Sequence, residues 1–296
     1  MLKTSRRLIA GVLALALSGA AFAPHATAQN ASSELSSALG AVAEAANTRT
    51  TFTHNIAGRT YKVAVPDSFT PGTATQVVLM FGGWQHSAAQ TQGYAKLENY
   101  LASNTLVVYA EASLTDNLYA WGGAPYSNIS VNGDVTYVRN VINDLVSRYG
   151  VNQHEIYATG LSNGGGMALA LGCHAPDLVA GVAGVAGAYY NPTVTNCAAG
   201  NVPTLIMHGT NDDTVAYNGG TRHGAPYQSV SQVFNTMANK NGCSTTSSQR
   251  EVGNTTVFNR NNCSAPTQVV RVNGGGHTWF TDPSASQQVA TFFNNL

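Results

Sequence analysis

The sequence predicts an α/β fold, in which helices cover both faces of a mostly parallel central sheet. Continuous apolar runs at 76–81 and 106–110 are typical of strands that are buried on both faces. Amphipathic segments such as 135–149 alternate with these runs, and repeated β-α-β units imply parallel strands. After residue 48 the chain has no linker-like tract and no internal repeat, so we expect a single domain over residues 49–296.

The predicted elements follow in order from residue 60. The first strand alternates polar and apolar residues, as an exposed antiparallel strand does. Asp134 is the expected N-cap of the helix at 135–149, one face of which carries Val138, Val141, Ile142 and Leu145. The helix after Ser162 is expected despite three glycines at its start. The full set comprises strands at 60–65, 76–81, 106–110, 155–159, 179–186, 204–208 and 268–272, and helices at 94–102, 135–149, 164–171, 229–239 and 284–294.

Residues 1–28 have the pattern of a secretory signal peptide. A basic start precedes a ten-residue apolar run at 8–17, and small residues with Ala-x-Ala patterns follow. A membrane-spanning helix needs roughly 20 apolar residues, so we expect no stable membrane insertion. We predict cleavage after Ala28, with Ala23 as the alternative, an N-terminal arm at 29–48, and an extracellular or periplasmic location.

The low content of charged residues limits the classes of molecule that this protein is expected to bind. Only 9% of the residues are charged, and removal of the predicted signal leaves 11 basic against 14 acidic residues. A weakly acidic, sparsely charged surface argues against nucleic acid and anionic lipid as partners. It suits a neutral substrate, such as an ester or polyester. Nothing in the sequence specifies an oligomeric state.

Four cysteines remain after the predicted signal, and an even number in an exported protein favours disulfides. Three pairings are possible. We favour Cys173–Cys197 and Cys243–Cys263, because each pair closes a local loop. The alternative, a zinc site, has no C-x-x-C or H-x-x-x-H spacing to support it, so no metal is predicted.

The run Gly160-Leu161-Ser162-Asn163-Gly164 predicts a nucleophilic serine. Such a serine projects from a sharp turn between a strand and a helix, where crowding favours glycine two positions before and after it. A run of this kind occurs by chance about 0.2 times in a chain of this composition, so the alternative is a plain glycine-rich turn. The apolar strand before it and the helix after it favour the catalytic interpretation.

A catalytic triad then needs an acid and a base, in the order Ser…Asp/Glu…His. Asp212 and Asp213 follow the strand at 204–208, and His277 follows the strand at 268–272 and three glycines. The active sites of α/β proteins lie at the carboxyl ends of strands, where these residues fall. Taken singly, the carboxylates could be turn residues and the histidine a surface residue. Either aspartate could be the acid.

Two backbone N–H groups must stabilise an oxyanion. One is expected from Asn163, the residue after the nucleophile, and the second from the loop after the strand at 76–81. Gly83 is the preferred donor in that loop, with Trp84 as the alternative. Trp84, Trp121 and Trp279 are candidate substrate contacts; the alternative is that they are buried structural aromatics.

Four segments together resemble a family of secreted α/β-hydrolase esterases that includes polyhydroxybutyrate depolymerases and feruloyl or acetylxylan esterases. They are GLSNGGGMALAL, HGTNDDTVAYNGG, NKNGC and VNGGGHTWF, and the resemblance covers most of the chain from about Thr60. It implies an α/β-hydrolase fold, Asp212 rather than Asp213 as the acid, His277 as the base, and paired cysteines. Two segments depart from the family pattern. The early loop reads Met-Phe-Gly-Gly-Trp-Gln instead of Leu-His-Gly-Cys-x-Gln, and Phe280 replaces a proline.

The resemblance implies a serine carboxylic-ester hydrolase that acts through an acyl-enzyme and needs no metal or organic cofactor. The wording of the motifs favours a polyhydroxyalkanoate (polyhydroxybutyrate) depolymerase-like polyester hydrolase. The alternatives are a feruloyl or acetylxylan esterase and an acyltransferase. A non-catalytic binding protein on a hydrolase scaffold is the least favoured, because it has no need of Ser162, Asp212 and His277 together.

Overall fold

The computed structural model describes residues 48–73 and 76–296, which belong to one compact unit. The predicted signal peptide at 1–28 lies outside the described residues, as does the predicted arm at 29–48 except for its last residue. Both stay predictions.

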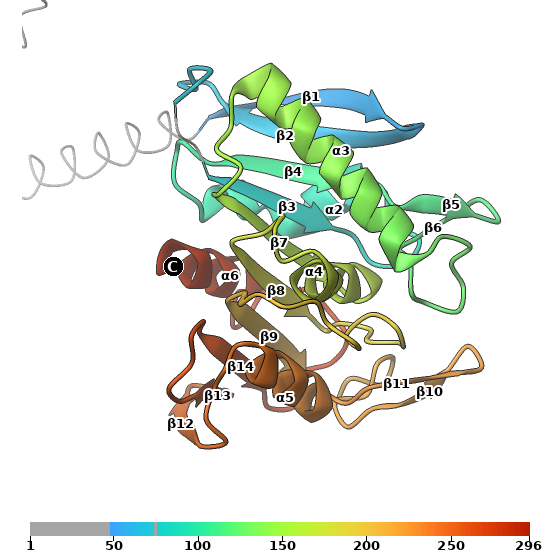
Figure 1. Ribbon diagram of the computed structural model, residues 1–296, viewed down its shortest axis with the longest axis vertical. Coiled ribbons are helices and arrows are strands. Elements are labelled where there is room, and N and C mark those ends of the chain that lie inside the picture. The colour runs from blue at the N-terminus through green and yellow to red at the C-terminus, as the bar shows by residue number, and fades with distance from the viewer. Residues whose placement is uncertain (1–47, 74–75) are drawn as a thin grey trace, which may run out of the picture. The chain divides into compact units, whose positions relative to one another are not determined.

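The core of the molecule is a ten-stranded sheet in the order β1-β2-β4-β3-β7-β8-β9-β14-β13-β12 (Figure 1). Its central strands, from β4 to β14, are all parallel, and β1, β2, β13 and β12 add antiparallel edges. The mostly parallel sheet is confirmed. The strands are β1 (Arg49–Ile56), β2 (Arg59–Pro66), β3 (Val77–Phe81), β4 (Leu106–Ala110), β7 (Ile156–Leu161), β8 (Gly181–Val185), β9 (Thr204–Gly209), β12 (Ser247–Val252), β13 (Thr255–Arg260) and β14 (Thr267–Val272). Two small hairpins join β5 (Ser113–Thr115) to β6 (Leu118–Ala120) and β10 (Gly220–Arg222) to β11 (Ala225–Tyr227).

Helices cover both faces of this sheet, as predicted (Figure 1). Alternate side chains of β3 point to opposite faces: Leu79 belongs to the core cluster that includes residues of α3, α4 and α5, whereas Met80 belongs to the cluster that includes residues of α2 and α6. Because both faces are covered, all five residues of β3 are buried, which explains its continuous apolar run. The helices are α2 (Ala88–Ala95), α3 (Val131–Tyr149), α4 (Asn163–His174), α5 (Val230–Lys240) and α6 (Ala285–Asn294), with a short 3₁₀ helix at Leu97–Asn99.

Three local predictions were wrong. β2 is mostly buried rather than exposed, because β1 extends the sheet beyond it. The helix expected at 94–102 begins and ends earlier in the chain, as α2. It starts after a capping box formed by Ser87 and Gln90, and it ends before Lys96, whose backbone is in the left-handed conformation. α3 begins at Val131 and is capped by Ser130, not Asp134.

Asp134 instead anchors α3 to its neighbours. Its buried carboxylate binds Nη1 of Arg59 on β2 at 2.5 Å and accepts the N–H of Gly122 at 2.5 Å. An N-cap prediction considers only the residues next to a helix end. It could not reveal a partner that is 75 residues away in the sequence.

Both favoured disulfides are present. Cys173 pairs with Cys197 and Cys243 with Cys263, closing loops of 24 and 20 residues. Cross-links of this length stabilise a fold by roughly 3 kcal/mol each in the chain-entropy model. Within the part of the chain that the structure describes, no helix combines the length and apolar character that crossing a membrane requires.

Candidate active site

Ser162 occupies a sharp turn between β7 and α4. Its backbone has φ 55° and ψ −118°, a conformation that L-residues rarely adopt and that stores strain. The N–H of Ser162 donates to the carbonyl of Val185 at 2.9 Å, and its carbonyl accepts from Gly166 and Ala188. The surrounding backbone therefore holds the serine in its strained geometry.

The two motif glycines leave no room for a side chain. A Cβ on Gly160 would lie 2.3 Å from the carbonyl oxygen of Gly164, and one on Gly164 would lie 2.2 Å from that of Phe81. Both obstacles are backbone atoms, which cannot rotate away as a side chain can. This contact geometry is the physical reason for the Gly-x-Ser-x-Gly spacing.

Replacing Gly164 with alanine is expected to destabilise the protein by about 3 kcal/mol or more, because it forces β3 and its following loop away from the turn. Gly93 is the matched control, because it is an exposed position in α2 where an added Cβ would meet no neighbouring atom within 4 Å. Gly93→Ala should stabilise by about 1 kcal/mol through helix propensity. Urea unfolding of the two variants measures the difference. A Gly164→Ala protein as stable as the wild type would contradict the crowded turn.

Asp212 and His277 come together from the loops after two adjacent parallel strands, β9 and β14. Nδ1 of His277 lies 2.8 Å from Oδ2 of Asp212. The other carboxylate oxygen, Oδ1, accepts the backbone N–H groups of Thr214 at 2.9 Å and Val215 at 2.7 Å. Asp213 is exposed, and within the described residues its carboxylate accepts a hydrogen bond only from the hydroxyl of Thr214, at 3.3 Å. The geometry therefore favours Asp212, which contacts His277, over Asp213 as the acid of the triad.

The electrostatics of Asp212 favour its ionised form. Burial raises the pKa of this carboxyl, but hydrogen bonds from His208, His277 and the Val215 N–H lower it more. The net effect is a pKa well below the ordinary value for aspartate. A permanently ionised carboxylate orients a histidine and stabilises the positive charge that the ring gains when it takes a proton.

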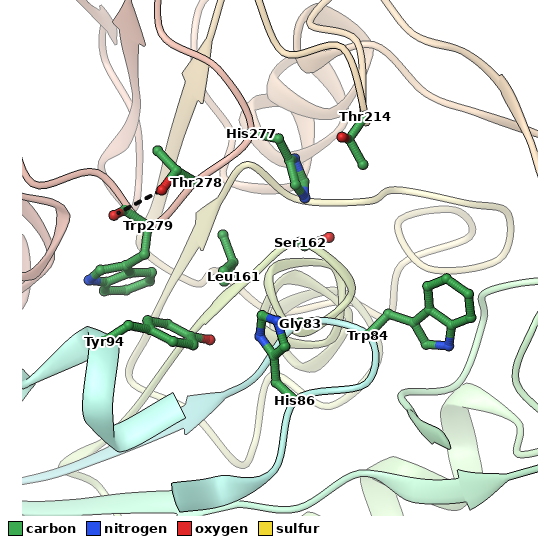
Figure 2. Close-up of a pocket in the computed structure, with 10 residues that line it drawn as sticks. All are labelled: Gly83, Trp84, His86, Tyr94, Leu161, Ser162, Thr214, His277, Thr278 and Trp279. Atoms are coloured by element: carbon green, nitrogen blue, oxygen red, sulfur yellow. Dashed lines mark hydrogen bonds between the residues drawn. The ribbon is translucent and has the colours of Figure 1, made fainter. Parts of the chain in front are cut away.

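His277 and Ser162 line the same cavity, whose volume is about 440 Å³ (Figure 2). Figure 2 shows the ring of His277 pointing into the cavity on the side of Ser162. The structure thus brings together the three residues that the sequence singled out, although they lie up to 115 positions apart in the sequence. The cavity lining comprises Gly83, Trp84, His86, Tyr94, Leu161, Ser162, Thr214, His277, Thr278 and Trp279.

The two residues expected to supply the oxyanion donors, Asn163 and Gly83, both lie next to Ser162. Asn163 is the first residue of α4, where backbone N–H groups have no partner within the helix. Its side chain is fixed, because Oδ1 accepts the N–H of Trp121 at 2.7 Å and Nδ2 donates to the carbonyl of Trp121 at 3.2 Å. Gly83 lines the cavity, and a Cβ there would lie 3.6 Å from the Cβ of Ser162. This close approach agrees with a backbone donor at Gly83.

The three tryptophans have different surroundings. Trp84 lines the cavity and packs against Tyr126 and His223, with ring centroids 4.7 and 5.1 Å away. Trp279 lines the opposite side of the cavity (Figure 2), and its Nε1 donates to the hydroxyl of Ser286 at 2.9 Å. Trp121 was wrongly expected at the site: it is 1% exposed and lies in the core, and its Nε1 donates to the carbonyl of Gly82 at 3.0 Å. Its role is to support the loop that carries Gly83.

His86 and Tyr94 are cavity residues that sequence reasoning missed. The ring of His86 packs near Gly83, and Tyr94 contacts it with centroids 5.5 Å apart. Burial and the charge of nearby His277 lower the pKa of His86, which favours a neutral ring. Neither residue belongs to a recognisable motif; only the fold brings α2 and its preceding loop against the turn. Among the residues described, no three or more His, Cys, Asp or Glu side chains are grouped as a metal site requires.

Comparisons with known proteins find similarity to esterases. A family model described as Phospholipase/Carboxylesterase matches residues 127–262. Feruloyl esterase B of Piromyces equi is 30% identical over 226 residues, which are 73% of this chain and 42% of that protein. Poly(3-hydroxybutyrate) depolymerase of Ralstonia pickettii is 37% identical over 95 residues, covering 30% of this chain and 19% of the other. The chain thus spans less than half the length of these relatives.

A solved structure, the acetyl xylan esterase from Aspergillus awamori, superposes on 83% of this chain and 100% of its own with a TM-score of 0.62. At 14% sequence identity, this likeness concerns the fold alone. The sheet order and this superposition show an α/β-hydrolase fold. The partial family match and the relatives make the chain similar to carboxylic-ester hydrolases, among them a feruloyl esterase and a poly(3-hydroxybutyrate) depolymerase.

Proposed function

We propose that this chain hydrolyses carboxylic esters with Ser162 as the nucleophile, His277 as the base and Asp212 as the residue that orients the base. One observation carries the proposal. A buried, ionised Asp212 binds Nδ1 of His277 at 2.8 Å, and the ring of His277 shares a cavity with Ser162. With its proton on Nδ1, the ring has Nε2 available to accept the proton of a serine hydroxyl.

The reaction then proceeds through an acyl-enzyme. His277 takes the proton of Ser162 as the serine oxygen attacks the ester carbonyl. The backbone N–H groups of Asn163 and Gly83 stabilise the oxyanion that forms. His277 returns the proton to the leaving alcohol, and it then activates a water molecule that releases the acid.

We further propose esters of plant-polysaccharide type as the substrate class, with an aromatic acyl group such as feruloyl preferred. This revises the expectation of a polyester, which the wording of the sequence motifs favoured. The similarity to feruloyl esterase B extends over 226 residues, whereas that to the polyhydroxybutyrate depolymerase extends over 95. The rings of Trp84, Tyr94 and Trp279 line the cavity and offer aromatic faces and edges to a planar acyl group.

A substrate panel tests both steps of this proposal. The wild type is assayed on four kinds of substrate, and Ser162→Ala serves as the inactive control. The substrates are methyl ferulate, acetylated xylan, p-nitrophenyl esters of increasing chain length and a polyhydroxybutyrate suspension. The expected result is the highest kcat/KM on methyl ferulate. Release of hydroxybutyrate without cleavage of ferulate or acetyl esters would overturn the substrate class, and failure on every ester would overturn the function.

We also propose that the protein is exported. The two disulfides support this, because such bonds persist in oxidising compartments. The signal-peptide pattern at residues 1–28 agrees. Recovery of the mature chain, beginning at Gln29, from the medium or periplasm of an expressing bacterium tests the proposal.

A further inference from the structure

A second histidine lies beside Asp212 and takes no part in the reaction described above. His208 is the fifth residue of β9 and is 1% exposed. Its Nε2 lies 3.1 Å from Oδ2 of Asp212, the same oxygen that binds His277, and 2.8 Å from the carbonyl oxygen of Val215. His208 therefore contacts the acid of the triad from within the protein, without lining the cavity.

The hydrogen-bond partners of His208 assign its protonation. Both atoms near Nε2 are acceptors, so Nε2 must carry a proton. Nδ1 is buried and has no hydrogen-bond partner among the described residues. A proton on Nδ1 would be a buried donor without an acceptor, which is strongly unfavourable. His208 is therefore an uncharged ring with its single proton on Nε2.

We propose that His208 is a positioning residue that holds the carboxylate of Asp212 in the plane required by His277. This inference rests on the proposed function, because the position of Asp212 matters to the reaction only if His277 is the base. The N–H groups of Thr214 and Val215 hold Oδ1, and the Nε2–H of His208, which donates to the Val215 carbonyl, also lies against Oδ2 at 3.1 Å. These contacts restrain rotation of the carboxylate, and Oδ2 presents its remaining acceptor direction to His277.

His208 also fastens the loop that carries the acid. The N–H of Val215 donates to Oδ1 of Asp212, and the carbonyl of the same residue accepts from His208. One imidazole N–H thus links the strand β9 to both the carboxylate and the backbone of the turn. Removing it takes away the contact of His208 with Oδ2 of Asp212 and leaves the carbonyl of Val215 without its imidazole donor.

Two substitutions separate positioning from packing. His208→Phe keeps a ring of similar size but removes the donor, whereas His208→Gln places an amide N–H at about the reach of Nε2. For the Phe variant we expect kcat to fall about 10- to 100-fold, the effect of losing one hydrogen bond to an ionised group. KM should change little, because no contact with the substrate is lost. The Gln variant should recover most of the kcat.

His174 offers a matched control. Its Nε2, like that of His208, lies near two oxygens, here the carbonyl oxygens of Pro192 and Thr193 at 2.9 and 3.1 Å, and among the described residues no hydrogen bond joins it to the triad. His174→Phe should leave kcat unchanged. A purely structural role for His208 would instead make the two Phe variants alike, with lowered stability and wild-type kcat in the folded fraction.

Two NMR measurements need no catalytic activity. In ¹⁵N-histidine-labelled wild type, His208 should show one protonated nitrogen, Nε2, and one unprotonated nitrogen, Nδ1. The downfield proton of His277 Nδ1 should move upfield in His208→Phe as its bond to Asp212 loosens. If the wild type cleaves no ester, the proposed function fails, while these spectra still test His208.

Three results would overturn the role of His208. They are a doubly protonated ring in the ¹⁵N spectrum, a folded His208→Phe protein with wild-type kcat, and a Gln variant that loses as much kcat as the Phe variant. If the Phe variant does not fold, the ¹⁵N spectrum of the wild type and the kcat of the Gln variant decide.

Discussion

Ser162→Ala is expected to lower kcat by roughly 10⁶-fold, by comparison with the loss of the nucleophile in other triads. The substitution removes one oxygen atom and leaves the backbone hydrogen bonds of the turn, so the fold and the cavity should persist. Hydrolysis of the substrate that the panel identifies measures kcat, and circular dichroism measures the fold. A folded Ser162→Ala protein with wild-type activity would remove Ser162 from the reaction.

Ser162→Gly is the matched variant, equally inactive but more stable. With φ 55° and ψ −118°, the turn has a conformation that glycine adopts without steric cost and that a side chain disfavours. We therefore expect Ser162→Gly to be more stable than Ser162→Ala by about 1 kcal/mol, even though glycine has the greater entropy in the unfolded chain. Urea unfolding of the pair measures this difference. Equal stabilities would mean that the turn stores no strain.

The elements of the fold that were predictable are those whose local pattern reflects their burial. β3 and β4 are apolar throughout because both faces are covered, and α3 carries one apolar stripe because one face packs on the sheet. β1 and β12 went unpredicted because their side chains are mostly exposed and impose no alternation. Strand pairing at a sheet edge satisfies backbone groups whatever the side chains are, so it leaves little trace in the sequence.

The candidate site likewise contains residues that the sequence could predict and residues that it could not. Ser162, Asp212 and His277 were predictable because each follows a recognisable strand, and chain order and sheet topology then bring them together. His86 and His208 were not, because their roles depend on what lies opposite them in space. His208 lies in β9, a strand that was correctly predicted, but only the structure shows that its Nε2 lies near Asp212. Partners of a catalytic residue are therefore the part of a site that a single sequence reveals least.

Acid should weaken the contribution of Asp212 to stability. Because its pKa is lower in the folded protein than in the unfolded chain, its ionised form stabilises the fold above the unfolded value of about 3.9. That contribution is lost as the pH falls through the unfolded value toward the folded one. Asp212→Asn should therefore be more destabilising at pH 7 than at pH 3, relative to wild type at each pH, as urea unfolding would show. A penalty that does not depend on pH would contradict the depressed pKa.

Asp212→Asn is also expected to lower kcat by about 10⁴-fold, through the tautomer of His277. The N–H groups of Thr214 and Val215 retain the amide oxygen in the place of Oδ1, so the NH₂ group must take the place of Oδ2. A donor there requires His277 to accept at Nδ1, which puts the ring proton on Nε2 and leaves no base for Ser162.

The neighbouring Asp213→Asn substitution is the control for Asp212→Asn, because it makes the same change of atoms one residue along the same loop. In the part of the chain that the structure describes, the exposed carboxylate of Asp213 accepts a hydrogen bond only from the Thr214 hydroxyl. The kcat of Asp213→Asn should therefore stay within about twofold of wild type. Steady-state kinetics of the two folded variants decides between the acids. A large loss in Asp213→Asn with little loss in Asp212→Asn would reverse the assignment, and with it the role given to His208.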